Sequence, residues 1–240
     1  MFRHQGKTRT LSHNKKIASL LSFVAGVVNV AGFISVERLT TNVTGHFAYF
    51  VDEVFKMQFT ASLVFFLYIL FFFLGSFVSS LFVEIFTRKN EQYIYFIPAF
   101  AESLILLAVA LFGFRLVDTH PNVIACTLLF AMGLQNSLVT RISNAIVRTT
   151  HLTGLFTDLG IEISQLFFYK KPEQKVKLIS TIKLRLRIIA YFFLGGIIGG
   201  VFYNSLELYV LLIPAVLLWI GLFYDNVKFR LLVWARRQVS

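Results

Sequence analysis

Six long apolar runs are the feature that most constrains what this chain can fold into. They cover about residues 17–36, 61–83, 93–114, 121–140, 186–203 and 207–224. An α-helix rises about 1.5 Å per residue, so roughly 20 apolar residues cross a hydrocarbon core of about 30 Å. The runs are too long for barrel strands and do not alternate. We therefore predict an all-α polytopic membrane protein with six transmembrane helices and a single transmembrane domain, residues 1–240.

Composition agrees with this class. Hydrophobic residues make up 57% of the chain and the mean hydropathy is +0.73, more apolar surface than a soluble domain of this size can bury. The single Cys126 excludes a disulfide framework within one chain. The sequence has no phosphate-binding loop, zinc-protease helix or nucleophile elbow. We expect neither an enzyme nor a cofactor, and no metal site.

The placement of the basic residues predicts the orientation. The net charge is +11, and an N-terminus inside would place 20 of the 23 Lys and Arg residues on the cytoplasmic side. Only Arg38, Lys56 and Arg115 would lie outside. We predict that both termini, residues 1–16 and 225–240, are cytoplasmic. The basic stretch 170–187 would contact anionic lipid headgroups, and we expect no nucleic-acid partner.

Four short markers occur twice, in the same order. "GVVN" at Gly26 returns as "GLQN" at Gly133, and "TTNVTGHF" at 40–47 returns as "TTHLTGLF" at 149–156. "FFLGSFVSSLF" from Phe72 returns as "FFLGGIIGGVF" from Phe192, and "IPA" at Ile97 returns at Ile213. The sequence therefore predicts an internal duplication, with repeat 1 at about 17–114 and repeat 2 at about 121–224.

An odd number of spans in each repeat inverts the second repeat relative to the first. Inverted repeats are typical of transporters that hold a solute near the bilayer midplane, and they also occur in channels.

The third marker carries small residues four positions apart. They are Gly75, Ser76, Ser79 and Ser80 in the first copy, and Gly195, Gly196, Gly199 and Gly200 in the second. Such residues let helix backbones approach closely in lipid. We expect these two helices to pack on each other near a pseudo-two-fold axis, or else on another helix or a neighbouring subunit. The Phe-rich and glycine-bearing faces are compatible with a homodimer.

These motifs resemble the YoaK family of bacterial inner-membrane proteins, a domain of unknown function, over about residues 17–224. "VAGVVNVAGFISV", "TNVTG", "AMGLQNSLVTRI" and "VRTTHLTGLFTDLG" carry the resemblance. It implies a six-helix protein of the bacterial inner membrane and supplies no substrate. The chain departs from the family pattern at Asn29, His46 and Asp158.

The two "TG" motifs are the candidate solute site. Each precedes a short apolar segment interrupted by acidic residues, at 43–57 and 152–168. These segments could be re-entrant half-helices, amphipathic helices on the membrane surface, or full spans. As half-helices they would begin near the midplane, capped by Thr44 and Thr153, and would offer free N–H groups to an anion or polar solute. The residues expected to bind solute are Thr41, Asn42, Thr44, Gly45, His46, Thr150, His151, Thr153 and Gly154.

Polar residues inside the apolar runs are further candidates, because hydrocarbon makes each one costly. Asn29, Gln135 and Asn136 could contact solute or clamp the broken backbone by hydrogen bonds. Glu102 is the one charge in its run and could couple transport to protons, with Asp158 as a second candidate.

The function that we expect is secondary transport of a small polar or anionic solute. A passive channel, or a structural or signalling membrane protein, is the alternative.

Overall fold

The computed structural model describes residues 10–88, 94–169 and 171–237, and these residues form helices without strands. The α-helices are α1 (Leu11–Val36), α2 (Val43–Phe55), α3 (Phe59–Arg88), α4 (Phe96–Phe112), α5 (Pro121–Ser143), α6 (Leu152–Phe168), α7 (Pro172–Leu206) and α8 (Leu212–Arg237). Two 3₁₀ turns join them, η2 (Gly113–Arg115) and η3 (Glu207–Leu211). The basic residues at 3, 7, 9, 89 and 170 lie outside the described residues.

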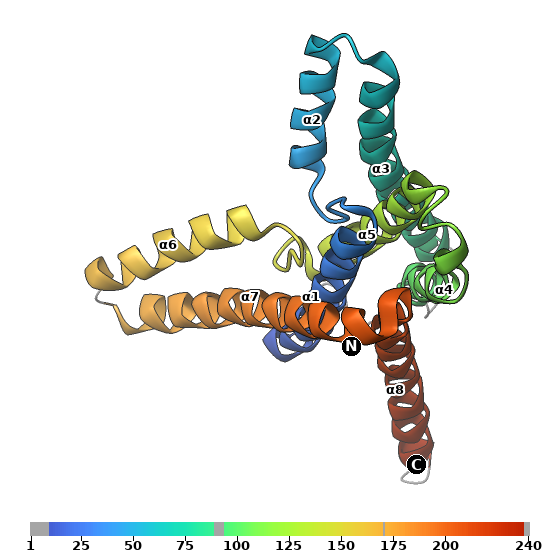
Figure 1. Ribbon diagram of the computed structural model, residues 1–240. Coiled ribbons are helices and arrows are strands. Elements are labelled where there is room, and N and C mark those ends of the chain that lie inside the picture. The colour runs from blue at the N-terminus through green and yellow to red at the C-terminus, as the bar shows by residue number, and fades with distance from the viewer. Residues whose placement is uncertain (1–9, 89–93, 170, 238–240) are drawn as a thin grey trace.

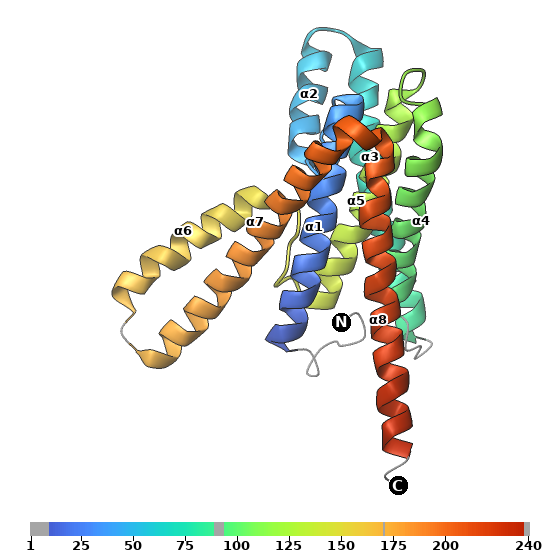
Figure 2. The ribbon, with the colours of Figure 1, turned by 60° about the horizontal axis from the view of Figure 1, so that its bottom comes forward.

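Five stretches of the described residues are long and apolar enough to cross a membrane. They are Ser12–Val36, Phe59–Arg88, Phe96–Arg115, Pro121–Ser143 and Pro172–Tyr224. The fifth has 53 residues and contains both α7 and the start of α8, with the chain turning back at η3 between them (Figure 2). These stretches confirm a helical protein compatible with several membrane crossings.

The helix α7 begins well before the predicted run at 186. Pro172 stands in its first turn, where the fixed φ of proline suits a helix start, and the basic stretch after it continues the same helix. The segment expected to lie on lipid headgroups is therefore the first half of a 35-residue helix.

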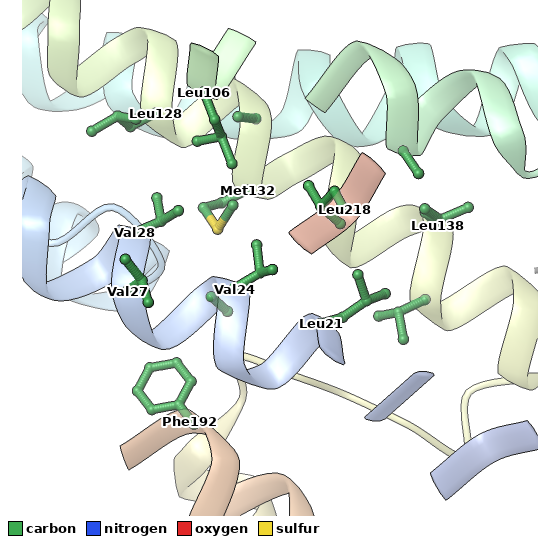
Figure 3. Packing of buried hydrophobic residues seen from close by; sticks show 14 of the residues in the cluster. Leu21, Val24, Val27, Val28, Leu106, Leu128, Met132, Leu138, Phe192 and Leu218 are labelled. Carbon is green, nitrogen blue, oxygen red and sulfur yellow. The ribbon is translucent and has the colours of Figure 1, made fainter. Parts of the chain in front are cut away.

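Two close helix pairs form the centre of the molecule. α7 crosses α1 in close contact, and α3 packs closely on α5, while α1 and α5 also contact each other (Figure 1). α4 and α8 pack together on one side of this centre. Figure 3 shows the core between them, where Val24 of α1, Met132 of α5 and Leu218 of α8 meet.

Glycines set the distance within both pairs. A Cβ on Gly26 of α1 would lie 2.0 Å from the Phe192 carbonyl oxygen of α7, and one on Gly195 would lie 2.1 Å from that of Phe23. The same reciprocal contact joins α5 to α3. A Cβ on Gly133 would lie 2.2 Å from the Phe72 carbonyl oxygen, and one on Gly75 would lie 2.1 Å from that of Phe130. Only glycine leaves room for backbones this close.

The small residues of α3 and α7 therefore pack on other helices rather than on each other. Ser76 donates a hydrogen bond to the carbonyl of Gly133 at 3.1 Å, and Gly199 faces Val27. Ser79 is buried, whereas Ser80, Gly196 and Gly200 are partly buried. The expectation that the two helices pack against each other at an axis is wrong, because each glycine row fits a glycine of the "GVVN" or "GLQN" marker.

The start of α1, the start of α4 and the end of α8 lie at one end of the bundle, and η2 and η3 lie at the other (Figure 2). At the first end, Arg141 of α5 forms an ion pair with Glu84 of α3.

Candidate functional site

The loop after α1 returns alongside the helix it has just left. Thr41 donates a hydrogen bond to the side-chain oxygen of Asn29 at 2.7 Å, and Thr40 donates to the Val28 carbonyl at 3.1 Å. Asn29 stands seven residues before the end of α1. Since each helical residue rises about 1.5 Å, the loop reaches roughly 10 Å back along α1 before α2 begins.

The loop after α5 makes the matching return. Thr150 donates to the side-chain oxygen of Asn136 at 2.7 Å, and Asn136 also stands seven residues before its helix ends. Gln135 donates to the Thr149 hydroxyl at 3.2 Å and to the Leu21 carbonyl of α1 at 3.0 Å. Asn29, Gln135 and Asn136 thus hold the loops by hydrogen bonds, which is the structural one of the two roles expected for them.

The caps of α2 and α6 lie two residues earlier than the sequence suggested. Asn42 is the N-cap of α2 and accepts a hydrogen bond from the Gly45 amide at 3.0 Å. His151 is the N-cap position of α6, and its ring makes no capping bond. The prediction that Thr44 and Thr153 are the caps is wrong, because both stand inside the first turn, where their side chains are exposed.

The glycine of each motif accommodates the cap residue. A Cβ on Gly154 would lie 2.6 Å from Nδ1 of His151, and one on Gly45 would lie 3.2 Å from the side-chain nitrogen Nδ2 of Asn42. The cap side chain folds back over the first turn at this position, so the frame "T-x-x-TG" follows from local geometry. Both helices begin near the place where α1 and α5 cross and run outward from it (Figures 1 and 2).

His46 is enclosed between α2 and α3. Its side chain is 3% exposed, its Nε2 lies 2.7 Å from the Leu39 carbonyl oxygen, and its ring centroid lies 4.9 Å from that of Tyr68. A carbonyl only accepts, so Nε2 carries the proton.

A family model described as a protein of unknown function (DUF1275) matches residues 17–224. The chain belongs to the DUF1275 family. No curated protein and no solved structure matches it. For this DUF1275 chain, the match confirms membership of a family of unknown function.

The two acidic candidates of this DUF1275 chain have contrasting surroundings. Glu102 on α4 is fully buried, and neither carboxyl oxygen has a hydrogen-bond partner among the described residues. The adjacent Ser103 donates to the Ala215 carbonyl of α8 at 3.2 Å. Asp158 on α6 is half exposed and pairs with Arg185 of α7 at 2.8 Å, and Glu162 pairs with the same guanidinium at 2.8 Å. Asp158 therefore helps to hold α6 on α7.

Sequence reasoning missed three residues around His46. Phe65 contacts the rings of His46 and Tyr68, the guanidinium of Arg38 lies 5.6 Å from the Phe65 centroid, and the Tyr68 hydroxyl donates to Asn122 at 2.5 Å. The available signal was that Arg38 is one of three basic residues on the sparsely charged side. Within the part of the chain that the structure describes, no three His, Cys, Asp or Glu residues gather as a metal site.

Proposed function

We propose that this chain is a secondary transporter of a small polar or anionic solute. One observation carries the proposal: two matching Asn–Thr hydrogen bonds, at 2.7 Å each, draw the loops before α2 and α6 back along α1 and α5. Each short helix then begins roughly 10 Å short of the level at which the preceding long helix ends. A helix start exposes N–H groups and the positive end of its dipole, which favour an anion or an electron-rich solute.

The architecture proposed is six transmembrane helices in two inverted repeats, 17–114 and 121–224. The glycine contacts support it, since each repeat contacts the other in the same way. "GVVN" of repeat 1 packs on "FFLGG" of repeat 2, and "GLQN" of repeat 2 packs on "FFLGS" of repeat 1. In this arrangement α2 and α6 are re-entrant half-helices from opposite faces. Non-helical backbone at membrane depth is tolerated where it is buried in protein or lines a cavity.

The solute site would lie between the two motifs. Thr44 and Thr153 are exposed beside the helix starts and would contact solute directly, whereas Asn29 and Asn136 would keep the loops in place. Conversion between outward-open and inward-open forms would rock one repeat against the other around this site.

The membrane setting completes the proposal. We place the protein in the bacterial inner membrane with both termini cytoplasmic, as a member of the YoaK group, in agreement with the basic residues of α7 and of the helix ends nearby. Exposed residues Lys171, Lys175 and Lys177 would meet anionic headgroups. A homodimer through the exposed apolar faces is compatible with this arrangement.

Reconstitution into liposomes tests the function. A panel of small carboxylates, amino acids, sugars and inorganic anions would be scored for uptake, saturation and counterflow. Saturable uptake with counterflow supports a carrier. Flux that does not saturate would identify a channel, and absence of flux for the whole panel would favour a structural or signalling role.

A further inference from the structure

Four side chains form a compact group beside the first turn of α2, here called the Arg38 cluster: Arg38, His46, Phe65 and Tyr68. The Phe65 ring lies next to the other three. Its centroid is 5.6 Å from the guanidinium carbon of Arg38, 6.2 Å from the ring centroid of His46 and 5.8 Å from that of Tyr68. The residues come from the α1–α2 loop, α2 and α3. The cluster thus joins one arginine to three aromatic rings.

The charge of Arg38 has no acidic partner among the described residues. Its Nη1 donates to the backbone carbonyl of Glu37 at 3.1 Å rather than to the carboxylate of that residue. Its Nε is buried and makes no hydrogen bond. A buried guanidinium donor without an acceptor is costly, so an acceptor from outside the chain would stabilise it.

His46 offers an unpaired acceptor, whereas Arg38 offers an unpaired donor. Because Nε2 donates to Leu39, Nδ1 of the neutral ring holds a lone pair, and this atom is buried without a partner. The cluster therefore offers an unmet donor and an unmet acceptor. A water molecule would pair with either atom, but only an anionic acceptor would also balance the positive charge of Arg38.

We propose that the Arg38 cluster binds a small carboxylate that carries a neighbouring hydroxyl group, with the carboxylate on Arg38 and the hydroxyl donating to Nδ1 of His46. The planar guanidinium matches a carboxylate. One positive charge balances one negative charge, whereas doubly charged phosphate would leave a charge unmatched in a site with aromatic walls. The inference rests on the proposed function in that this compound would be the transported solute, held at the part of the solute site that the first motif forms through His46.

The second motif differs at both positions. Val147 and Leu155 stand where the first has Arg38 and His46, and both are buried apolar residues. Binding of this kind belongs to the first half only, which predicts one carboxylate for each chain.

Ligand-observed NMR on the full chain in detergent tests the binding without any need for flux. Lactate and propionate form the probe pair, because they differ only in the hydroxyl group. We expect saturable binding of both, with lactate about three- to tenfold tighter, as for one added hydrogen bond. Inorganic phosphate should not compete.

Three variants assign the binding to residues. Arg38→Gln should weaken both ligands at least about tenfold, and His46→Leu should abolish the preference for lactate while keeping propionate binding. Arg115→Gln is the matched control, since Arg115 of η2 likewise lies over a phenylalanine ring, 5.4 Å from the centroid of Phe114, and is not a member of the cluster. It should change nothing.

Several results would overturn the inference: no saturable binding of either acid to the unmodified chain, competition by phosphate as strong as by lactate, or equal losses in Arg38→Gln and Arg115→Gln. If Arg38→Gln does not fold, the preference of the unmodified chain and of His46→Leu still decides. Carboxylate binding without uptake in liposomes would sink the transporter proposal alone.

Discussion

At the scale of single residues, the two Asn–Thr bonds have the same length and the same place in their halves. Asn29 and Asn136 each accept from a threonine that opens the following motif. The repeated amide was recognisable in the sequence, and its role as a loop clamp was one of two expectations. The cap positions were not predictable, because Asn42 and Thr44 are both good capping residues and the loop path decides which one reaches the first amides of α2. At α6 the N-cap position falls on His151, whose side chain makes no capping bond.

A double-mutant cycle on Asn136 and Thr150 measures the clamp. Each alanine substitution should lower the free energy of unfolding by about 1 kcal/mol, with a coupling of similar size between them. Unfolding would be followed in detergent, with Thr181→Ala as control because its hydroxyl bonds only its own helix. Strictly additive losses would contradict a direct bond.

Two substitutions of Glu102 test its effect on stability and its role in uptake separately. Since both carboxyl oxygens are buried without partners, Glu102→Leu, which introduces the residue found at the matching position 218, should stabilise the protein by about 1–3 kcal/mol. Glu102→Gln should remove the pH dependence of uptake and leave stability nearly unchanged. Uptake in Glu102→Gln that still follows pH would exclude this carboxyl from proton coupling.

At the scale of elements, the two short helices are attached by different chemistry. Tyr49 of α2 stacks on Phe65 of α3 at 5.2 Å, and the corresponding positions in the second half are Asp158 and Arg185, which form an ion pair. Similar hairpins thus have an aromatic contact in one half and a charged contact in the other. The sequence showed the acidic residues but not their partner on α7.

Glycine substitutions test the close helix pairs. Gly26→Ala places a Cβ 2.0 Å from a backbone oxygen that cannot rotate away, so it should destabilise the protein by about 1–3 kcal/mol or more. Gly160→Ala is the matched control, because no atom lies within 4 Å of its Cβ position. That change should be neutral or stabilising by up to about 1 kcal/mol. Equal thermal stability of both variants would refute the contact.

At the scale of the whole molecule, the proposed topology places the α2–α3 turn and the end of α3 on opposite membrane faces. Single cysteines at Lys56 and Arg88, in a background without Cys126, would be labelled with an impermeant maleimide on intact cells. Position 56 should react from outside and position 88 only after lysis. Labelling of both from the same side would favour α2 as a full span.

The sequence by itself determined the class, the approximate apolar runs and the duplicated markers, because length and hydropathy are local properties that the bilayer requires of any spanning helix. Only the tertiary structure decided which glycine row meets which helix, where the loops return and which charges find partners. These contacts join residues far apart in the chain, and backbone clearances of a few ångströms select among pairings that the sequence leaves equal. The Arg38 cluster belongs to this second group, since its residues are brought together by the return of the first loop.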